Sequence, residues 1–167
     1  MLSWADLQNN LNALDTQFRS AGSTRDVHFC CKLALMELAG WTEQAMDSII
    51  SECASRTLSE PSNKRYCADS IIKTTYGFEY QKHFRGMMMR LIGLVHVERI
   101  ERQADPAKLA RLEGALQTLK VLRDPAAHTH INGMTPSMNA PSFMIGQLAP
   151  ISDGLQEIEK ALIAAGF

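Results

Sequence analysis

The stretch LKVLRDPAAHTHING, residues 119–133, holds the side chains best suited to chemistry in this chain. Arg123 and His128 lie five positions apart, separated by Asp, Pro and two Ala. An imidazole that titrates near neutral pH can accept or donate a proton, and a neighbouring guanidinium can hold a phosphate. The pair therefore suits attack of an RNA 2′-hydroxyl on its own phosphodiester. We expect His128 to act as base or acid and Arg123 to stabilise the charge on phosphorus, with no metal or cofactor.

Arg123 stands where a helical pattern predicts an apolar side chain. The stripe Leu109, Leu112, Leu116 and Leu119 advances by three or four residues, and its next position is 123. Because an unpaired buried charge is very costly, the guanidinium must have a partner. The pattern therefore predicts that Arg123 meets a carboxylate, a water-filled cleft, a subunit interface or an anionic ligand.

Pro125 predicts an end or a kink in the helix that carries Arg123, because its ring clashes with the carbonyl of the preceding turn. Asp124 would then be the N-cap of a new turn that contains His128, where free N–H groups favour an anion. On an unbroken helix, Arg123 and His128 would instead be about 140° apart and about 7.5 Å apart along the axis. In both cases we expect the two side chains to frame one small space. A single His leaves half of the proton transfers unassigned, and a second copy of the site across a dimer would supply them.

Two neighbours are candidates for a supporting role. Lys120 lies one turn before Arg123 and would add phosphate affinity, unless it belongs to a solvated face. His130 could join His128 as a metal ligand in an extended segment, but no carboxylate follows at ligand spacing. We therefore interpret His130 as a contact to substrate or to the residues around it. A structural alternative also exists, in which Arg123 is a helix-terminal cation satisfied by Asp124 and His128 is a packed histidine bonded to a carbonyl.

A second group, Tyr76, Phe78 and Tyr80 beside Lys82 and Arg85, could stack an unpaired base. Such a cluster more often caps one end of a helical bundle, and we favour that interpretation.

Composition and charge limit the number of domains and the kinds of ligand that the chain can bind. The chain has 167 residues, of which 46% are hydrophobic, and a net charge of -1, so one domain over residues 1–167 is predicted. The charge excludes a global basic field, so nucleic acid would have to bind at a local patch. The N-terminal residues predict no signal peptide, and the longest central apolar run is broken by Arg90. We expect a cytoplasmic protein without a membrane segment. Its four cysteines, at 30, 31, 53 and 67, are predicted to be reduced thiols in or near the core.

Nearly every long segment has helical periodicity, which predicts an all-α up-and-down bundle with additional short helices. Helices are expected over residues 3–22, 24–40, from 42 to a break at 59–63, 64–74, 79–101, 106–122 and from 150 onward. Gly40 is the expected stop of the second, and a loop over residues 133–142 precedes the last.

The segment RDPAAH, residues 123–128, fits the Arg-x4-His signature of the HEPN superfamily of α-helical proteins. With YGFEYQKHF, residues 76–84, LKVLRDPAAHTHI and the helix order, most of the chain resembles the RiboL-PSP-HEPN branch. The resemblance implies a bundle of HEPN type and a homodimer in which two motifs share one ribonuclease site. It implies that Arg123 and His128 are catalytic and that Asp124 takes the polar position, where Asn is common. RNA would be the substrate. A toxin or anti-phage role, with an antitoxin protein as partner, is implied as well. The alternative is a catalytically silent HEPN module that binds a partner protein or a nucleotide.

Overall fold

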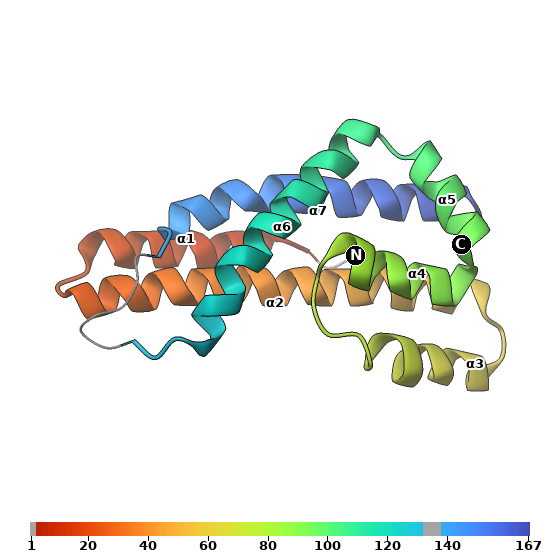
Figure 1. Cartoon of the computed structure of the whole chain (residues 1–167), viewed down its shortest axis with the longest axis horizontal. Coiled ribbons are helices and arrows are strands. Elements are labelled where there is room, and N and C mark those ends of the chain that lie inside the picture. Colours follow the sequence, from red (N-terminus) through yellow and green to blue (C-terminus); the bar gives the residue numbers. More distant parts are fainter. Residues whose placement is uncertain (1–2, 132–137) are drawn as a thin grey trace.

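The computed structural model describes residues 3–131 and 138–167. Over these ranges the chain is helical and contains no strand, so the all-α prediction is confirmed. Figure 1 shows α1, α2 and α7 running along the long axis, while α6 crosses them obliquely and the shorter helices gather at one end. The elements are α1 (Ala5–Ser20), α2 (Thr24–Thr57), α3 (Pro61–Tyr66), the π-helical turns η1 (Cys67–Ile72) and η2 (Tyr80–Phe84), α4 (Arg85–Ile92), α5 (Leu94–Gln103), α6 (Pro106–His128) and α7 (Pro141–Ala164).

Helix α2 is the longest element and the one on which α1, α4, α6, α7 and η1 all pack. Its 34 residues span about 51 Å at the usual rise. The hydroxyl of Ser23 caps its start by accepting the N–H of Asp26 at 3.1 Å, so the cap lies one residue before the predicted Thr24.

The predicted stop at Gly40 is wrong, because α2 continues through it and includes the segment expected to be a separate helix from Thr42. A single interior Gly costs a helix only about 1 kcal/mol, and packing on both sides outweighs this. Leu38 and Met46 are fully buried on either side of it. Thr42 is also buried, and its hydroxyl donates to the carbonyl of Leu38 at 2.7 Å, which satisfies the group inside the helix.

The long helix expected over residues 79–101 is also wrong. The segment divides into η2, α4 and α5, with a break at Gly93, whose φ is 84°. This left-handed conformation is accessible to Gly and strained for other residues. Because the chain turns here, Leu94 and Val95 lie outside the core and are 56% and 78% exposed.

Helix α6 begins at Pro106, the predicted start of the helix expected over residues 106–122. The carboxylate of Asp105 caps it by accepting the N–H groups of Ala107 and Lys108. Its inward face is confirmed for Leu112, Leu116 and Leu119, which are buried.

Helix α7 begins at Pro141, well before the predicted start near Pro150, which lies inside the helix. The expected loop therefore overlaps the first residues of α7, and its residues 133–137 lie outside the described part. The inward face of α7 consists of buried apolar side chains, which include Ile151, Leu155, Ile158 and Leu162.

Helix α6 packs closely on α7, and this packing holds α6 in position. Gly154 of α7 lies against Leu112 of α6, and a Cβ added at Gly154 would be 2.5 Å from the Leu112 Cβ.

The predicted core thiols are confirmed as well, since all four cysteines are free and buried. No helix within the described ranges is both long and apolar enough to cross a bilayer.

Candidate active site

The candidate site lies in the last two turns of α6, which continues through Pro125 to His128. The predicted break at Pro125 and the N-cap role of Asp124 are therefore wrong. A proline this near the end of a helix removes one backbone hydrogen bond, while the earlier turns of α6 stay packed on α7 and α2. The helix ends at His128, and the next residue, Thr129, is its C-cap, whose hydroxyl donates to the carbonyl of Pro125 at 2.7 Å.

The unbroken helix gives the four candidate side chains distinct directions. Lys120, Asp124 and His128 follow one another at four-residue steps and so lie along one face. Arg123 is about 100° from Asp124, turned toward the bundle, and about 140° from His128. The helical alternative of the sequence prediction thus applies, and the framing of one small space by Arg123 and His128 stays a prediction.

Arg123 is held between a ring and two carboxylates. Its guanidinium lies 5.2 Å from the centroid of the buried Phe78 ring. Its nitrogen atoms lie 3.6 Å from Glu43 of α2 and 3.3 Å from Asp124. Both distances exceed the 2.7–2.9 Å of a strong charge-assisted hydrogen bond, and the side chain keeps 27% of its exposure. Of the partners predicted for Arg123, the structure shows carboxylates, those of Glu43 and Asp124.

Lys120 and Asp124 form an ion pair with each other, at 3.0 Å between Nζ and Oδ2. The hydrogen bond from Lys120 lowers the pKa of Asp124, and the charges of Lys120, Arg123 and His128 lower it further. The same bond raises the pKa of Lys120. Asp124 therefore remains charged at neutral pH and lies within electrostatic reach of both Arg123 and His128.

Several charged groups near this site were not singled out from the sequence. Glu43 and Asp47 lie one turn apart on α2, and burial, followed by the charge of Glu43, raises the pKa of Asp47 to about 6. Near them, the His83 Nδ1 accepts the N–H of Glu79 at 3.1 Å, and burial lowers the pKa of His83. The four-residue spacing of Glu43 and Asp47 could have indicated two carboxylates on one face of a helix. It could not have indicated that Arg123 of α6 lies next to Glu43.

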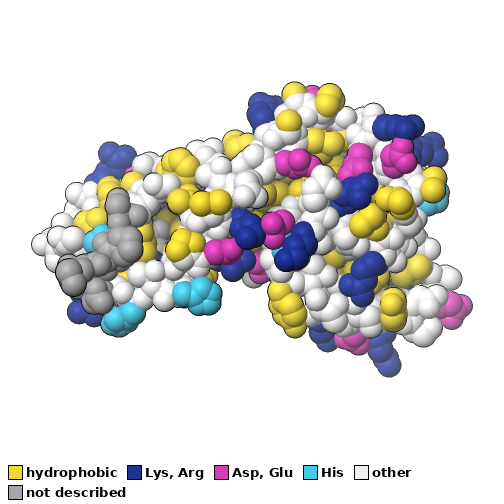
Figure 2. Space-filling model, in the orientation of Figure 1, with side chains coloured by type: hydrophobic (Ala, Val, Ile, Leu, Met, Phe, Trp, Pro, Cys, Tyr) yellow, Lys and Arg dark blue, Asp and Glu magenta, His cyan; other side chains and the backbone are white. Residues whose placement is uncertain are grey.

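Acidic and basic side chains are interleaved over this part of the molecule. Figure 2 shows Lys and Arg beside Asp and Glu in the middle of the face that it presents, with no extended patch of one sign there. This local balance matches the net charge of -1 of the whole chain. Any anion bound at Arg123 must therefore compete with Glu43 and Asp124.

The two candidate histidines have different surroundings. His128 and His130 are both exposed, and His130 lines a groove between α2 and the segment after α6. Among the residues that the structure describes, no three His, Cys, Asp or Glu side chains are grouped closely enough to hold a metal ion.

The aromatic cluster packs into the fold, as the favoured interpretation predicted. Phe78 and Tyr80 are 1% and 4% exposed, so their faces are unavailable to a base. The Tyr80 hydroxyl and Arg85 both bond to Glu101 of α5, which ties η2 and α4 to that helix. Tyr76 differs, because 82% of it is exposed.

Comparison with known proteins gives no relative: no family model, curated protein or solved structure matches this chain.

Proposed function

We propose that this protein is a metal-independent endoribonuclease of HEPN type that acts as a homodimer in the cytoplasm. The observation that carries the proposal is that both side chains of the Arg-x4-His pair at the end of α6 are at least partly exposed and that the ion pairs of Arg123 are long. His128 is exposed, and Arg123 is partly exposed and lies 3.3 and 3.6 Å from its two carboxylate partners. A phosphate can displace such contacts, because a bidentate phosphate pair with Arg has shorter and stronger hydrogen bonds.

In the proposed reaction, His128 removes the proton from a ribose 2′-hydroxyl, and the oxygen attacks the adjacent phosphorus. The bond from phosphorus to the 5′-oxygen breaks, and that oxygen receives a proton from a second imidazole. The products are a 2′,3′-cyclic phosphate and a 5′-hydroxyl. Arg123 stabilises the negative charge that builds up on the phosphoryl oxygens.

The angle between the two side chains favours a site made from two copies. Within one chain, Arg123 and His128 are about 140° apart on α6, which works against both contacting one phosphate. In a two-fold dimer, Arg123 of one protomer can face His128 of its partner. The second histidine then supplies the proton that the leaving group requires. A toxin or anti-phage role, with an antitoxin protein as partner, extends the same proposal.

A second candidate is a helical module without catalytic activity that binds a partner protein or a nucleotide. The pairing of Arg123 with Glu43 and Asp124 favours it, since a guanidinium already neutralised by two carboxylates has little net field for RNA.

The two candidates differ in RNA cleavage by the purified protein. We expect wild type to cleave a labelled RNA in EDTA and to leave cyclic phosphate ends. His128→Ala and Arg123→Ala should each lose at least a hundredfold in rate, the lower range for a general acid–base or a charge-stabilising group. Matched controls are His96→Ala and Arg111→Ala, which remove exposed side chains on α5 and α6.

Three results would count against the nuclease. Equal cleavage by all variants indicates a contaminating enzyme, and loss of cleavage in EDTA indicates a metal-dependent one. No cleavage, together with harmless expression of wild type, supports the binding module.

A further inference from the structure

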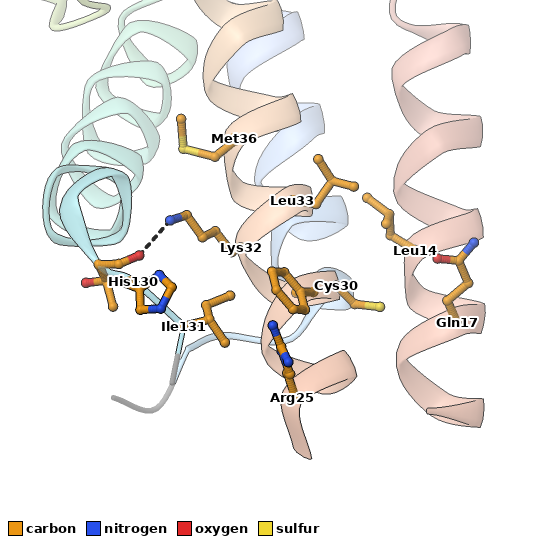
Figure 3. A pocket seen from close by; sticks show the side chains of 11 residues that line it. Leu14, Gln17, Arg25, Cys30, Lys32, Leu33, Met36, His130 and Ile131 are labelled. Carbon is orange, nitrogen blue, oxygen red and sulfur yellow. Dashed lines mark hydrogen bonds between the residues drawn. The ribbon is translucent and has the colours of Figure 1, made fainter. Parts of the chain in front are cut away.

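A groove crosses α2 between α1 and the residues that follow α6. Its volume is about 470 Å³, within the range of small-molecule sites. Figure 3 shows α1 on one side of α2 and the segment of His130 and Ile131 on the other. The lining residues are Leu14, Gln17, Arg25, Phe29, Cys30, Lys32, Leu33, Met36, Thr129, His130 and Ile131. Neither Arg123 nor His128 is among them.

The floor and one wall of the groove are apolar. Leu14, Cys30 and Ile131 line it from buried positions. Phe29, Leu33 and Met36 follow on one face of α2 at helical spacing and are 47%, 49% and 36% exposed. Three large apolar side chains left in contact with water along one groove mark a surface that gains free energy when covered.

Charges at the groove have one sign. Among the described residues that line it, Arg25 and Lys32 are the charged ones, His130 is a further basic side chain, and none is Asp or Glu. The Arg25 guanidinium lies over the Phe29 ring at 5.5 Å, and the Lys32 ammonium donates to the carbonyl of Thr129 at 2.7 Å. An ammonium has three N–H donors, so Lys32 keeps two for another acceptor. In the described chain neither Arg25 nor Lys32 is paired with a carboxylate, unlike Lys120 and Arg123 near the end of α6.

We propose that this groove binds a small amphipathic anion, with an apolar body and a single carboxylate, such as a medium-chain fatty acid. The apolar body covers Phe29, Leu33 and the buried floor, and the carboxylate lies against Lys32 and His130. The volume suits a molecule of this size, and the positive charges of Arg25 and Lys32 select an anion. This site uses neither Arg123 nor His128, and it shares His130 with the candidate RNA contacts.

The test is calorimetric titration of the purified chain with monomeric decanoate. We expect one site per chain, and binding of octanoate weaker by roughly fourfold for each methylene removed. Lys32→Gln should weaken decanoate binding by roughly two- to fivefold, as expected for a partly exposed ion pair. Leu33→Ser should weaken binding further. Leu94→Ser, which changes an exposed leucine on α5 away from the groove, should leave it unchanged.

Each alternative occupant gives a different result. No binding of decanoate at millimolar concentration overturns the proposal, as does equal binding of a cation with the same tail, decyltrimethylammonium. Binding to anionic phospholipid vesicles without binding of monomeric decanoate would assign the groove to a membrane surface. A dimer that Phe29→Ser dissociates and decanoate does not affect would assign it to a second copy of the chain. Circular dichroism of each variant separates loss of binding from loss of the fold.

Discussion

Replacing Asp47 with Asn should stabilise the protein at neutral pH and leave it unchanged in acid. The carboxyl of Asp47 is partly buried one turn from Glu43, and burial and that charge raise its pKa from 3.8 to about 6. The folded state therefore binds more protons than the unfolded state between about pH 4 and 6. Stability contributed by the protonated form is present below pH 4 and is lost as the pH rises through 6.

The magnitude follows from the size of the pKa shift. A shift of about 2 units corresponds to about 3 kcal/mol, and the remaining contact of Asp47 with water reduces the expected effect to about 1–2 kcal/mol. The amide that Asp47→Asn introduces carries no charge at any pH, so the variant should gain this amount at pH 7 relative to wild type and nothing at pH 4.

Urea denaturation followed by circular dichroism at pH 4, 5, 6 and 7 measures this difference. With an m-value of about 2 kcal/mol/M, the midpoint of the Asp47→Asn variant should exceed that of wild type by about 0.5–1 M at pH 7. Other carboxyls also titrate in this range, and they cancel when the variant is compared with wild type. Asp153→Asn, at an exposed position on α7, is the control and should show no such difference. A midpoint difference that is equal at pH 4 and pH 7 would refute the reasoning, because it would have no electrostatic origin.

Three further changes test the packing and the candidate site. Gly154→Ala brings a Cβ to 2.5 Å from the Leu112 Cβ, so it should lower the free energy of unfolding by about 1–3 kcal/mol in urea denaturation. Pro125→Ala restores a backbone donor near the end of α6 and should raise stability by about 1 kcal/mol, measured as a higher melting temperature. Glu43→Gln removes one competitor for Arg123, and fluorescence polarisation at low salt should show RNA affinity rising roughly two- to fivefold.

Each of these changes has a control. Gly114→Ala, at an α6 position where an added Cβ meets nothing within 4 Å, should not destabilise the chain. If Gly154→Ala is equally harmless, the contact between α6 and α7 is looser than described. Unchanged stability in Pro125→Ala would mean that the last turn contributes little to folding. For Glu43→Gln, removal of the exposed Glu98 on α5 is the comparison, and equal effects of both would point to net charge rather than to Arg123.

Local patterns predicted the fold class and the inward faces, because they depend only on which side chains recur at helical spacing. Leu112, Leu116, Leu119 and the buried face of α7 follow directly from such spacing. Helix boundaries could not be predicted from such local patterns, because a Gly allows a helix to end at its position but does not make it end there. Gly40 lies inside α2 where packing on both sides holds the helix together, whereas Gly93 has a φ of 84° and divides α4 from α5.

The candidate site was predictable in part. The place of Arg123 in the leucine stripe predicted a partner for it, and a carboxylate is present. The identity of that carboxylate depends on how α6 crosses α2, which brings Glu43 next to a residue far along the chain. The angle at which α6 crosses α2 depends on tertiary packing, so the residues around Arg123 do not predict it. The break at Pro125 was mispredicted for a related reason, since the packing of α6 outweighs the lost hydrogen bond.

Burial of the four thiols gives the chain internal reporters of transient opening. Cys30 and Cys31 lie toward one end of α2, Cys53 lies near its other end, and Cys67 belongs to η1. Burial raises the pKa of Cys53 to about 11 and also raises those of Cys31 and Cys67. Since alkylating reagents react with the thiolate, the rate of labelling at each cysteine measures how often its surroundings expose it. Single-cysteine variants would thus time the fraying of α2 separately at its two ends.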